Sequence, residues 1–466
     1  MAEHTRVLVL GGGPGGYAAA FAAADLGLQV TLVDDAPNPG GVCLYRGCIP
    51  SKTLLHVARL LREAEEARAF GVAFAPPAID LAALRRHKEQ VVAKLTGGLG
   101  QLARQRKITY LQGRGRFISP HSLTVQRADS AVEVTFDYAI IATGSLPRTL
   151  DVLKGQGDLV WDSTAALELS EVPRRLLVVG GGYIGVELAS VYQALGAEVT
   201  LLEVTAGLLP GVDPDLVRPL LQSLKGRMRL HFETSVAALE RSGDGLRATI
   251  EGKDGRTLLE VDRLLASVGR APQTAGIGLE ALGLSPGGGG FLEVDAQRRT
   301  TLEHLFAIGD VAGQPMLAHK ASHEGRVAAE AIAGRKAAFD ARAITAVVFT
   351  DPEIAWAGLS EQAAKAAGIE PQVGKFPWAA SGRAASLGRG DGLTKIVADR
   401  ATGRVLGVGI VGPGAGELIA EGALAIEMGA LAEDVAHTIH PHPTLSETMM
   451  EAAEGILGHA THYYGR

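Results

Sequence analysis

The sequence predicts an α/β protein with two Rossmann-like dinucleotide-binding domains and a C-terminal α+β domain built on an antiparallel sheet. A strand, a glycine turn and a helix occur in that order from residue 7 and again from residue 176. Each first strand is a continuous apolar run, as expected of parallel strands buried on both faces. From residue 344 the pattern changes to alternating strands, which indicates an antiparallel sheet.

The length of 466 residues corresponds to about three domains. We expect the first dinucleotide-binding domain in two parts, 1–149 and 273–343, the second at 150–272, and the C-terminal domain at 344–466. Within the last domain we expect strands over 344–349 and 393–411, the second broken by a turn at 400–403, and a helix over 417–428.

Composition excludes several functional classes. Lys+Arg 45 against Asp+Glu 51 gives a net charge of -6 without long single-sign runs, so we expect no nucleic-acid partner. Residues 7–24 carry no charge, but glycine and proline fill 11–16 and the charged start of an export signal is missing. We therefore expect a cytoplasmic protein without a membrane segment.

The glycines of the two repeats match dinucleotide fingerprints. The first motif has Gly11, Gly13 and Gly16, and the second has Gly180, Gly182 and Gly185. Such glycines permit a tight turn and let backbone amides meet a pyrophosphate at the positive end of a helix. Asp34 and Glu203 each lie 23 residues after the first glycine, where a carboxylate suits a ribose hydroxyl. One such motif is often a structural turn, but two with matching offsets favour binding.

The second acidic residue also distinguishes NAD from NADP. The carboxylate of Glu203 accepts a ribose hydroxyl and repels a 2′-phosphate. The first basic residue after it is Arg218, so no cation lies nearby in the sequence to pair with that phosphate. The second site is therefore predicted to bind NAD.

The two cysteines, Cys43 and Cys48, form the candidate redox centre. Two cysteines in so long a chain exclude a disulfide framework, and no second pair exists to complete a zinc site, so we predict no metal. A regular helix would separate them by about 7.5 Å along its axis, more than the roughly 7 Å that a disulfide spans between α-carbons. We expect a distorted helix, with Pro50 as the cause because it cannot donate to the carbonyl of Arg46. Two buried free thiols are the alternative.

Two charged residues accompany the cysteines. Lys52 follows Cys48 by one helical turn, where its charge would favour a thiolate, although a surface lysine is the ordinary interpretation. Glu187 lies early in an otherwise apolar helix and either serves the site or only complements the helix dipole.

The segment from Gly40 to Lys52 resembles the active-site segment of the dihydrolipoyl dehydrogenase family, within the class I pyridine nucleotide-disulfide oxidoreductases. The resemblance covers essentially the whole chain. It also includes 142–144 (Ala-Thr-Gly), 268–270 (Val-Gly-Arg), 306–310 (Phe-Ala-Ile-Gly-Asp) and 440–447 (His-Pro-His-Pro-Thr-Leu-Ser-Glu).

The resemblance implies an enzyme that oxidises protein-bound dihydrolipoamide through a Cys43–Cys48 disulfide and FAD and passes hydride to NAD. It implies that Cys43 exchanges with substrate, that Cys48 faces the flavin, and that Lys52 pairs with Glu187 beside it. The residues implied for FAD are Gly11, Gly13, Gly16, Asp34, Lys52, Thr143, Gly144, Asp310, Ala318 and His319. Those implied for NAD are Gly180, Gly182, Tyr183, Gly185, Glu203, Val268 and Gly269.

The resemblance further implies a homodimer in which His442 is the acid/base, Glu447 orients it, and both act on the cysteines of the other subunit. Residues 444–447 also read as a capping box that starts a helix. The carboxylate of Glu447 has two oxygens and can serve both purposes. The implied partner is a lipoyl-bearing acyltransferase or a glycine-cleavage carrier protein.

Tyr45 and Arg46 depart from the family pattern, which commonly has asparagine followed by a small or basic residue. A phenol between the cysteines is expected to affect access to Cys43 or the redox potential. Glutathione reductase is disfavoured by Ser51 and Glu203, and mercuric reductase by the lack of further cysteines. A flavoprotein scaffold without thiol turnover is the alternative from another class.

Overall fold

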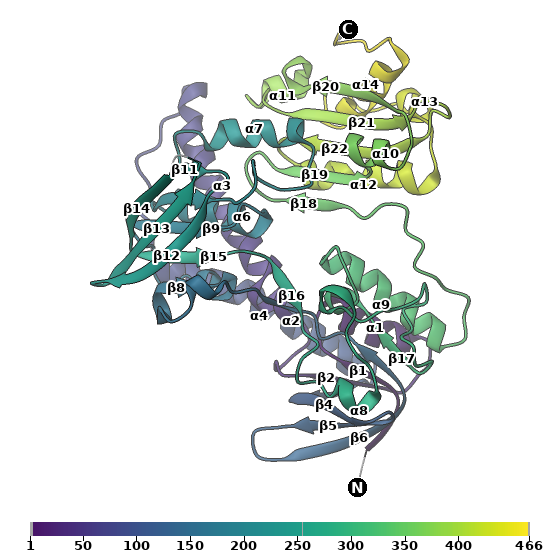
Figure 1. Ribbon diagram of the computed structural model, residues 1–466. Coiled ribbons are helices and arrows are strands. Elements are labelled where there is room, and N and C mark those ends of the chain that lie inside the picture. Colours follow the sequence, from purple (N-terminus) through teal and green to yellow (C-terminus); the bar gives the residue numbers. More distant parts are fainter. Residues whose placement is uncertain (1–2, 254, 465–466) are drawn as a thin grey trace.

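The computed structural model describes residues 3–253 and 255–464, so the outermost residues of the first and last expected domains lie outside it. Its first lobe is a sheet in the order β3-β2-β1-β6-β5-β4, with β17 beside β6 (Figure 1). The strands are β1 (Glu3–Leu10), β2 (Val30–Asp34), β3 (Thr109–Gln112), β4 (Arg114–Ser119), β5 (Ser122–Gln126), β6 (Ala131–Ile141) and β17 (Leu305–Ala307). Strand β5 pairs antiparallel with β4 and β6, and the other pairs are parallel.

Two helices of the first lobe, α1 (Pro14–Asp25) and α9 (Ala318–Ile332), cross in close contact. A Cβ on Gly325 would lie 2.6 Å from the carbonyl oxygen of Gly15, so glycine permits this approach. Because α9 comes late in the chain, residues on both sides of the second lobe in the sequence build the first one.

The second lobe is a parallel sheet in the order β11-β10-β9-β15-β8. Its strands are β8 (Val160–Trp161), β9 (Arg175–Val179), β10 (Glu198–Leu202), β11 (Arg229–His231) and β15 (Arg263–Ala266), with helices α5 (Ser163–Glu168), α6 (Tyr183–Ala194) and α7 (Pro214–Leu224). Between β11 and β15 the chain forms an antiparallel meander that was not predicted from the sequence. Its strands are β12 (Ser235–Ser242), β13 (Gly245–Gly252) and β14 (Gly255–Val261).

Two connections join the lobes. One is the short ribbon of β7 (Ser145–Pro147) and β16 (Arg270–Pro272). The other is α3 (Cys48–Glu66), which packs against α6 of the second lobe and against α4 (Leu81–Gln105) and α2 (Gly41–Arg46). Helix α3, which begins at the second cysteine, therefore connects the first lobe to the second. The short helix α8 (Leu279–Leu282) packs on β4.

The C-terminal domain is an antiparallel sheet in the order β18-β19-β22-β21-β20, drawn in green at the top of Figure 1. Its elements are β18 (Ala346–Val348), β19 (Ile354–Gly358), β20 (Pro371–Pro377), β21 (Leu393–Asp399), β22 (Val405–Val411), α10 (Glu361–Ala366), α11 (Gly382–Ser386), α12 (Ala415–Met428), α13 (Ala432–His437) and α14 (Glu447–Leu457). The predicted hairpin and helix are present, and the predicted fold class is confirmed.

A buried ionic cluster joins the C-terminal domain to the second lobe. Lys395 of β21 is 2% exposed, and its Nζ lies 2.8 Å from Asp213, 3.2 Å from Asp215 and 2.5 Å from Glu361. Asp213 and Asp215 lie at the start of α7, so these contacts fix that helix against the sheet.

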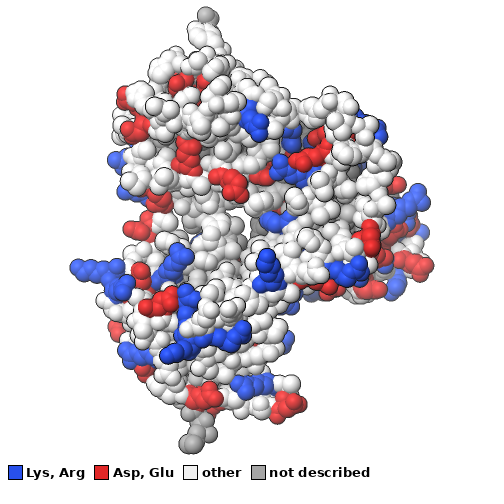
Figure 2. All heavy atoms as spheres, turned by 180° about the vertical axis from the view of Figure 1, so that it is seen from behind, with Lys and Arg blue, Asp and Glu red and all other residues white. Residues whose placement is uncertain are grey.

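Charges are mixed over the surface. Figure 2 shows Lys and Arg interspersed with Asp and Glu on both halves of the visible face, with a hollow between the halves. In the residues that the structure describes, no helix is long and apolar enough to cross a membrane.

Candidate active site

The two cysteines lie on either side of a break between two helices. Helix α2 ends at Arg46 and α3 begins at Cys48, with Gly47 between them. A Cβ on Gly47 would lie 2.9 Å from the carbonyl oxygen of Val42, so the turn favours glycine. The helix is therefore interrupted between the thiols, which is the kind of distortion expected from their spacing.

The position of this distortion agrees with the expected one, between the two cysteines. Pro50 is the third residue of α3 and has no N–H to donate to the carbonyl of Arg46, the last residue of α2. The first helical hydrogen bond after the break runs from Ser51 N to Gly47 O at 3.0 Å. The close packing of Gly47 against Val42 adds a second reason for the break.

The two thiols differ in acidity. The thiol of Cys43 hydrogen-bonds to Cys48, and this bond, together with the charge of Lys52, lowers the pKa of Cys48 to about 7 although neighbouring atoms desolvate it. The same hydrogen bond, followed by desolvation, raises the pKa of Cys43. Both cysteines are free thiols. Cys48 is therefore the thiol that ionises first.

Lys52 and Glu187 form an ion pair beside the cysteines. Lys52 Nζ lies 2.8 Å from Glu187 Oε2, and the glutamate side chain is only 4% exposed. Its other oxygen accepts a hydrogen bond of 2.9 Å from the backbone N–H of Phe349. The structure thus brings together Cys43, Cys48, Lys52 and Glu187, and it adds Phe349, which the sequence analysis missed.

A phenol that the sequence analysis also missed faces the thiols. Burial, followed by the charges of Cys43 and Cys48, raises the pKa of Tyr17 on α1. The sequence feature that could have identified Tyr17 is its position directly after Gly16, the last glycine of the first fingerprint. Tyr183, the first residue of α6, was expected at the nicotinamide, and desolvation by neighbouring atoms raises its pKa to about 12.

The first fingerprint has the geometry of a pyrophosphate cradle. A Cβ on Gly11 would collide with the carbonyl of Ala142, and one on Gly16 with the carbonyl of Gly11. Gly13, by contrast, caps α1 and has no other atom closer than 4.0 Å to where its Cβ would lie. Open space at a helix N-terminus suits a phosphate group.

The carboxylate of Asp34 lies against this turn. It accepts hydrogen bonds from Gly12 N at 2.5 Å and Ala36 N at 2.9 Å. Burial raises its pKa more than these bonds lower it. Each oxygen keeps a second lone pair, so Asp34 fits a ribose hydroxyl.

The second fingerprint repeats this geometry. Gly180 and Gly185 are crowded by backbone carbonyls, and a Cβ on Gly182 would meet nothing within 4 Å. Glu203 accepts hydrogen bonds from Gly181 N at 2.6 Å and Thr205 N at 2.8 Å. Val268 and Gly269 follow β15 at the same end of the sheet. Both fingerprints therefore fit a dinucleotide.

Asp310 lies in a polar network at the end of β17. Its Oδ2 accepts a hydrogen bond of 2.5 Å from Ser145, whose hydroxyl accepts one of 2.7 Å from Arg270. The neighbouring Gly309 N–H donates to Glu324, which is fully buried and paired with two cations. Ser145 and Glu324, which were not predicted from the sequence, fix the turn that carries Asp310.

Four more residues were predicted for the same cofactor as Asp310. Thr143 donates a hydrogen bond of 2.7 Å to the carbonyl of Gln273, and Gly144 follows it with a φ of 74°. Ala318 begins α9, and His319 Nε2 lies 2.7 Å from the carbonyl oxygen of Thr345.

His442 and Glu447 form a separate pair in the C-terminal domain. His442 Nδ1 lies 2.8 Å from Glu447 Oε1, and the imidazole is 71% exposed. Helix α14, which begins at Glu447, lies far from α2 in Figure 1. Within one chain the structure does not bring this pair to the cysteines, so a role there requires a second subunit.

Tyr45 is engaged elsewhere than at the thiols. Its hydroxyl donates a hydrogen bond of 3.1 Å to the carbonyl of Asn38. Its ring lines a cavity of about 350 Å³ together with Lys88 and Thr96. Tyr45 thus ties α2 to the loop after β2. Arg46 is exposed at the end of α2.

Comparison with known proteins gives consistent matches over the whole chain. Residues 5–325 match the pyridine nucleotide-disulphide oxidoreductase family, and residues 344–453 match its dimerisation domain. The dihydrolipoyl dehydrogenase of Vibrio cholerae serotype O1 is 46% identical over 98% of this chain and 96% of its own length. The Haemophilus influenzae enzyme of that name is 47% identical with the same coverage.

Solved structures agree with these matches. LpdA from Mycobacterium tuberculosis superposes with a TM-score of 0.89 at 31% identity, covering 97% of this chain and 99% of that one. The HOCl-induced flavoprotein disulfide reductase RclA from Escherichia coli, solved as a Cu(II) complex, gives 0.85 at 28% identity with the same coverage.

Proposed function

The chain belongs to the pyridine nucleotide-disulphide oxidoreductase family and acts as an FAD- and NAD-dependent dihydrolipoyl dehydrogenase, in which we propose that Cys43, Cys48 and His442 carry the thiol chemistry. The observation that supports this assignment is the placement of two thiols, one on each side of a helix break, beside the Lys52 ammonium and the buried carboxylate of Glu187. A dithiol with one ready thiolate is suited to disulfide exchange.

In the proposed exchange, Cys43 and Cys48 begin as a disulfide. A thiolate of the dihydrolipoyl group attacks Sγ of Cys43, the disulfide breaks, and Cys48 leaves as a thiolate. The second lipoyl thiol then attacks the first lipoyl sulfur, which is bonded to Cys43 in the mixed disulfide. Cys43 is released and takes up the proton of this second thiol. The products are a cyclic lipoyl disulfide, one enzyme thiol and one thiolate.

The proton of the first lipoyl thiol goes to His442 of the partner subunit. Since residues 344–453 match the family's dimerisation domain, the chain forms a homodimer. Glu447 holds the imidazole by Nδ1, which leaves Nε2 to accept the proton. The 71% exposure of His442 in the isolated chain suits a residue that acts on another subunit.

Two cofactor sites complete the proposal. When bound, FAD carries the electron pair from the dithiol to NAD. Backbone amides at the start of α1, Asp34 and Asp310 would hold FAD, and the start of α6 with Glu203 would hold NAD. The ammonium of Lys52 stabilises the thiolate of Cys48, and Glu187 holds that ammonium by an ion pair although its own charge opposes the thiolate.

The finer parts of the proposal concern domains, location and partners. We assign residues 1–149 and 273–343 to the FAD domain, 150–272 to the NAD domain, and 344–466 to the dimerisation domain. A close cysteine pair that serves catalysis, in a chain without a disulfide framework, is typical of a reducing compartment. We therefore assign the protein to the cytoplasm. Its substrate is the lipoyl group of another chain, either an acyltransferase or the glycine-cleavage carrier.

The direct test is steady-state NAD reduction with free dihydrolipoamide, with glutathione and NADP as controls. We expect NAD reduction by dihydrolipoamide and little turnover with either control. Preference for glutathione or NADP would overturn the assignment. The reduced holoenzyme should also show a long-wavelength charge-transfer band, which a scaffold without thiol turnover would lack.

A further inference from the structure

Phe349, from the segment that follows β18, contacts both members of the Lys52–Glu187 pair. Its backbone N–H donates to Glu187 Oε1 at 2.9 Å. The centroid of its ring lies 4.7 Å from Lys52 Nζ. One residue of the C-terminal domain therefore touches the cation through its ring and the anion through its backbone.

The ring itself is not explained by core packing. Phe349 is 36% exposed, and it lies at the wall of a cavity of about 520 Å³ that Lys52 also lines. Its edge faces Gly416 of α12, where an added Cβ would lie 3.7 Å from the ring. A large apolar side chain that remains partly exposed beside an ammonium group indicates a role in holding that charge.

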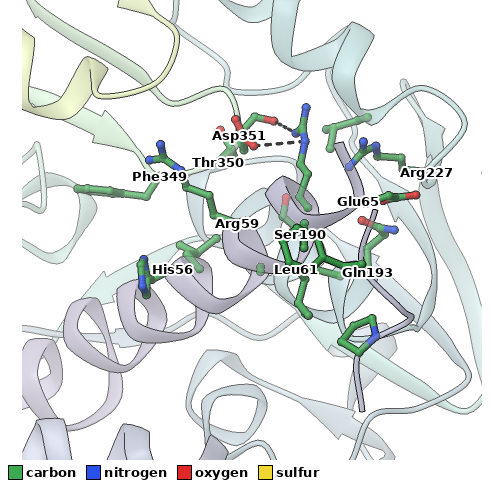
Figure 3. Close-up of a pocket in the computed structure, with 18 of the residues that line it drawn as sticks. His56, Arg59, Leu61, Glu65, Ser190, Gln193, Arg227, Phe349, Thr350 and Asp351 are labelled. Atoms are coloured by element: carbon green, nitrogen blue, oxygen red, sulfur yellow. Dashed lines mark hydrogen bonds and ion pairs between the residues drawn. The ribbon is translucent and has the colours of Figure 1, made fainter. Parts of the chain in front are cut away.

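The segment after Phe349 is anchored along α3. Arg62 Nε lies 3.2 Å from Asp351 Oδ2, and Arg59 lies 3.5 Å from Glu353. Figure 3 shows Phe349 and Asp351 beside the helix that carries His56 and Arg59, with dashed contacts to Asp351. These ion pairs fix the segment against the same helix that begins at Cys48, so the ring has a defined position.

The position of Lys52 matters because its charge acts on the thiols. Lys52 is 30% exposed, and its ammonium is joined to one carboxylate oxygen at 2.8 Å. A lysine stem is flexible, so a single contact leaves the charge free to move toward solvent. A ring on a second side restricts that motion and excludes water.

We propose that Phe349 is a positioning residue for the redox centre, holding the Lys52 ammonium and the Glu187 carboxylate in fixed places beside Cys48. This role deepens the proposed thiol chemistry and rests on it. The ring acts through Lys52, the group that it contacts.

Other charged and titratable groups also face this site. Cys48 meets Cys43 from α2, Lys52 from α3, and Glu187 from α6. Tyr17 of α1 and Tyr183 of α6 also face it. On the far side of Lys52 lie His56, Arg59 and Glu353, which line the same cavity. Replacing Phe349 with an apolar residue changes none of these groups, so a changed titration reports the placement of Lys52.

The test is the pH titration of the thiolate in reduced holoenzyme. In Phe349→Leu, Lys52 is less fixed and better solvated, so the thiolate of Cys48 is less stable. A cation–π contact of this kind corresponds to about a threefold effect, so we expect the midpoint to rise by about half a pH unit. The charge-transfer band and the pH dependence of Cys48 alkylation, mapped by mass spectrometry, both measure it.

Two matched variants separate positioning from a general structural effect. Phe349→Tyr keeps the ring and should keep the wild-type midpoint. Phe21→Leu removes another ring that lies 4.9 Å from a guanidinium, that of Arg106, and should also leave the midpoint unchanged. An unchanged midpoint in Phe349→Leu, or an equal shift in either matched variant, would overturn the proposal.

If Phe349→Leu loses thermal stability or FAD content while the midpoint of the thiolate titration is unchanged, the proposal is likewise overturned. If Phe349→Leu does not accumulate as folded holoenzyme, Phe349→Met is judged by the same criterion. Reduction by NADH or dithionite makes the titration independent of lipoyl substrate. A failure of dihydrolipoamide turnover in the wild-type enzyme is thereby distinguished from a failure of this inference.

Discussion

His442 and Glu447 form an oriented pair, with Nδ1 of the imidazole 2.8 Å from Oε1 of the carboxylate. The second oxygen accepts a hydrogen bond of 2.7 Å from Thr444 N. The capping box expected over residues 444–447 is not formed, because α14 begins at Glu447 with Ser446 as its N-cap and the hydroxyl of Thr444 bonds to Pro441 O. Glu447 thus holds the turn before α14 and the imidazole at once.

Replacing His442 with alanine should lower dihydrolipoamide turnover by about 10²–10⁴-fold, the usual contribution of a general acid/base. NADH oxidation by artificial acceptors should persist, because that reaction bypasses lipoyl exchange. Steady-state assays of both reactions check this. Full lipoamide activity in His442→Ala would rule out the role of the imidazole.

Glu447 should also contribute to stability in a pH-dependent way. Burial alone would raise its pKa, but the bonds from Thr444 N and His442 outweigh burial and leave the pKa below its ordinary value of 4.5. This stabilisation is present above the ordinary pKa and is lost as the pH falls through the lowered one. Thermal melts of wild type and Glu447→Gln should differ at neutral pH and converge in acid. A constant difference across the range would contradict this.

Lys52→Met should raise the pKa of Cys48 above its value of about 7, because it removes a positive charge beside the thiolate. The alkylation rate of Cys48 in the reduced protein, followed against pH, measures the shift. Lys94→Met, on the exposed part of α4, is the control and should leave the profile unchanged. A lower midpoint in Lys52→Met would contradict the assigned electrostatics.

Glu203→Ala should raise KM for NAD by about 10-fold or more, since hydrogen bonds to a charged group contribute about 1.5–3 kcal/mol. Reduction of the enzyme by dihydrolipoamide without NAD should be unaffected, because that half-reaction uses the other site. Stopped-flow and steady-state measurements separate the two. A slower thiol half-reaction with an unchanged KM for NAD would contradict the assignment of Glu203 to NAD binding.

Lys395→Met should destabilise the protein by about 3–5 kcal/mol, because it leaves three carboxylates without their buried cation. Chemical denaturation measures the loss. Lys375→Met is the matched control, since its side chain is 44% exposed and its pairs should contribute less than about 1 kcal/mol. Equal losses in the two variants would show that burial of Lys395 is not the cause.

The sequence identified those parts of the site that require a particular residue type. Gly11 and Gly180 are glycine because a Cβ would collide with the backbone, and this requirement leaves a pattern that can be read. The contact from Phe349 N to Glu187 leaves no such pattern, because every residue except proline has a backbone N–H. The spacing of Cys43 and Cys48 indicated a distorted helix but not that Gly47 is where it breaks.

The fold shows the same division. The strands β1 and β9 were found because each ends in a continuous apolar run of four residues. The meander was missed because most residues of β12 and β14 are exposed, which weakens the apolar pattern that identifies a strand. Contacts between distant segments, such as Lys395 with the start of α7, depend on packing that no local pattern specifies.

The two oxygens of Glu187 have a consequence for how the chain matures. The glutamate belongs to the second lobe, Lys52 follows the cysteines of the first, and Phe349 belongs to the C-terminal domain. A chain whose C-terminal domain has not yet docked leaves one of these oxygens without its partner. The redox centre is therefore completed only when all three parts have assembled, and its spectrum reports correct folding of the whole subunit.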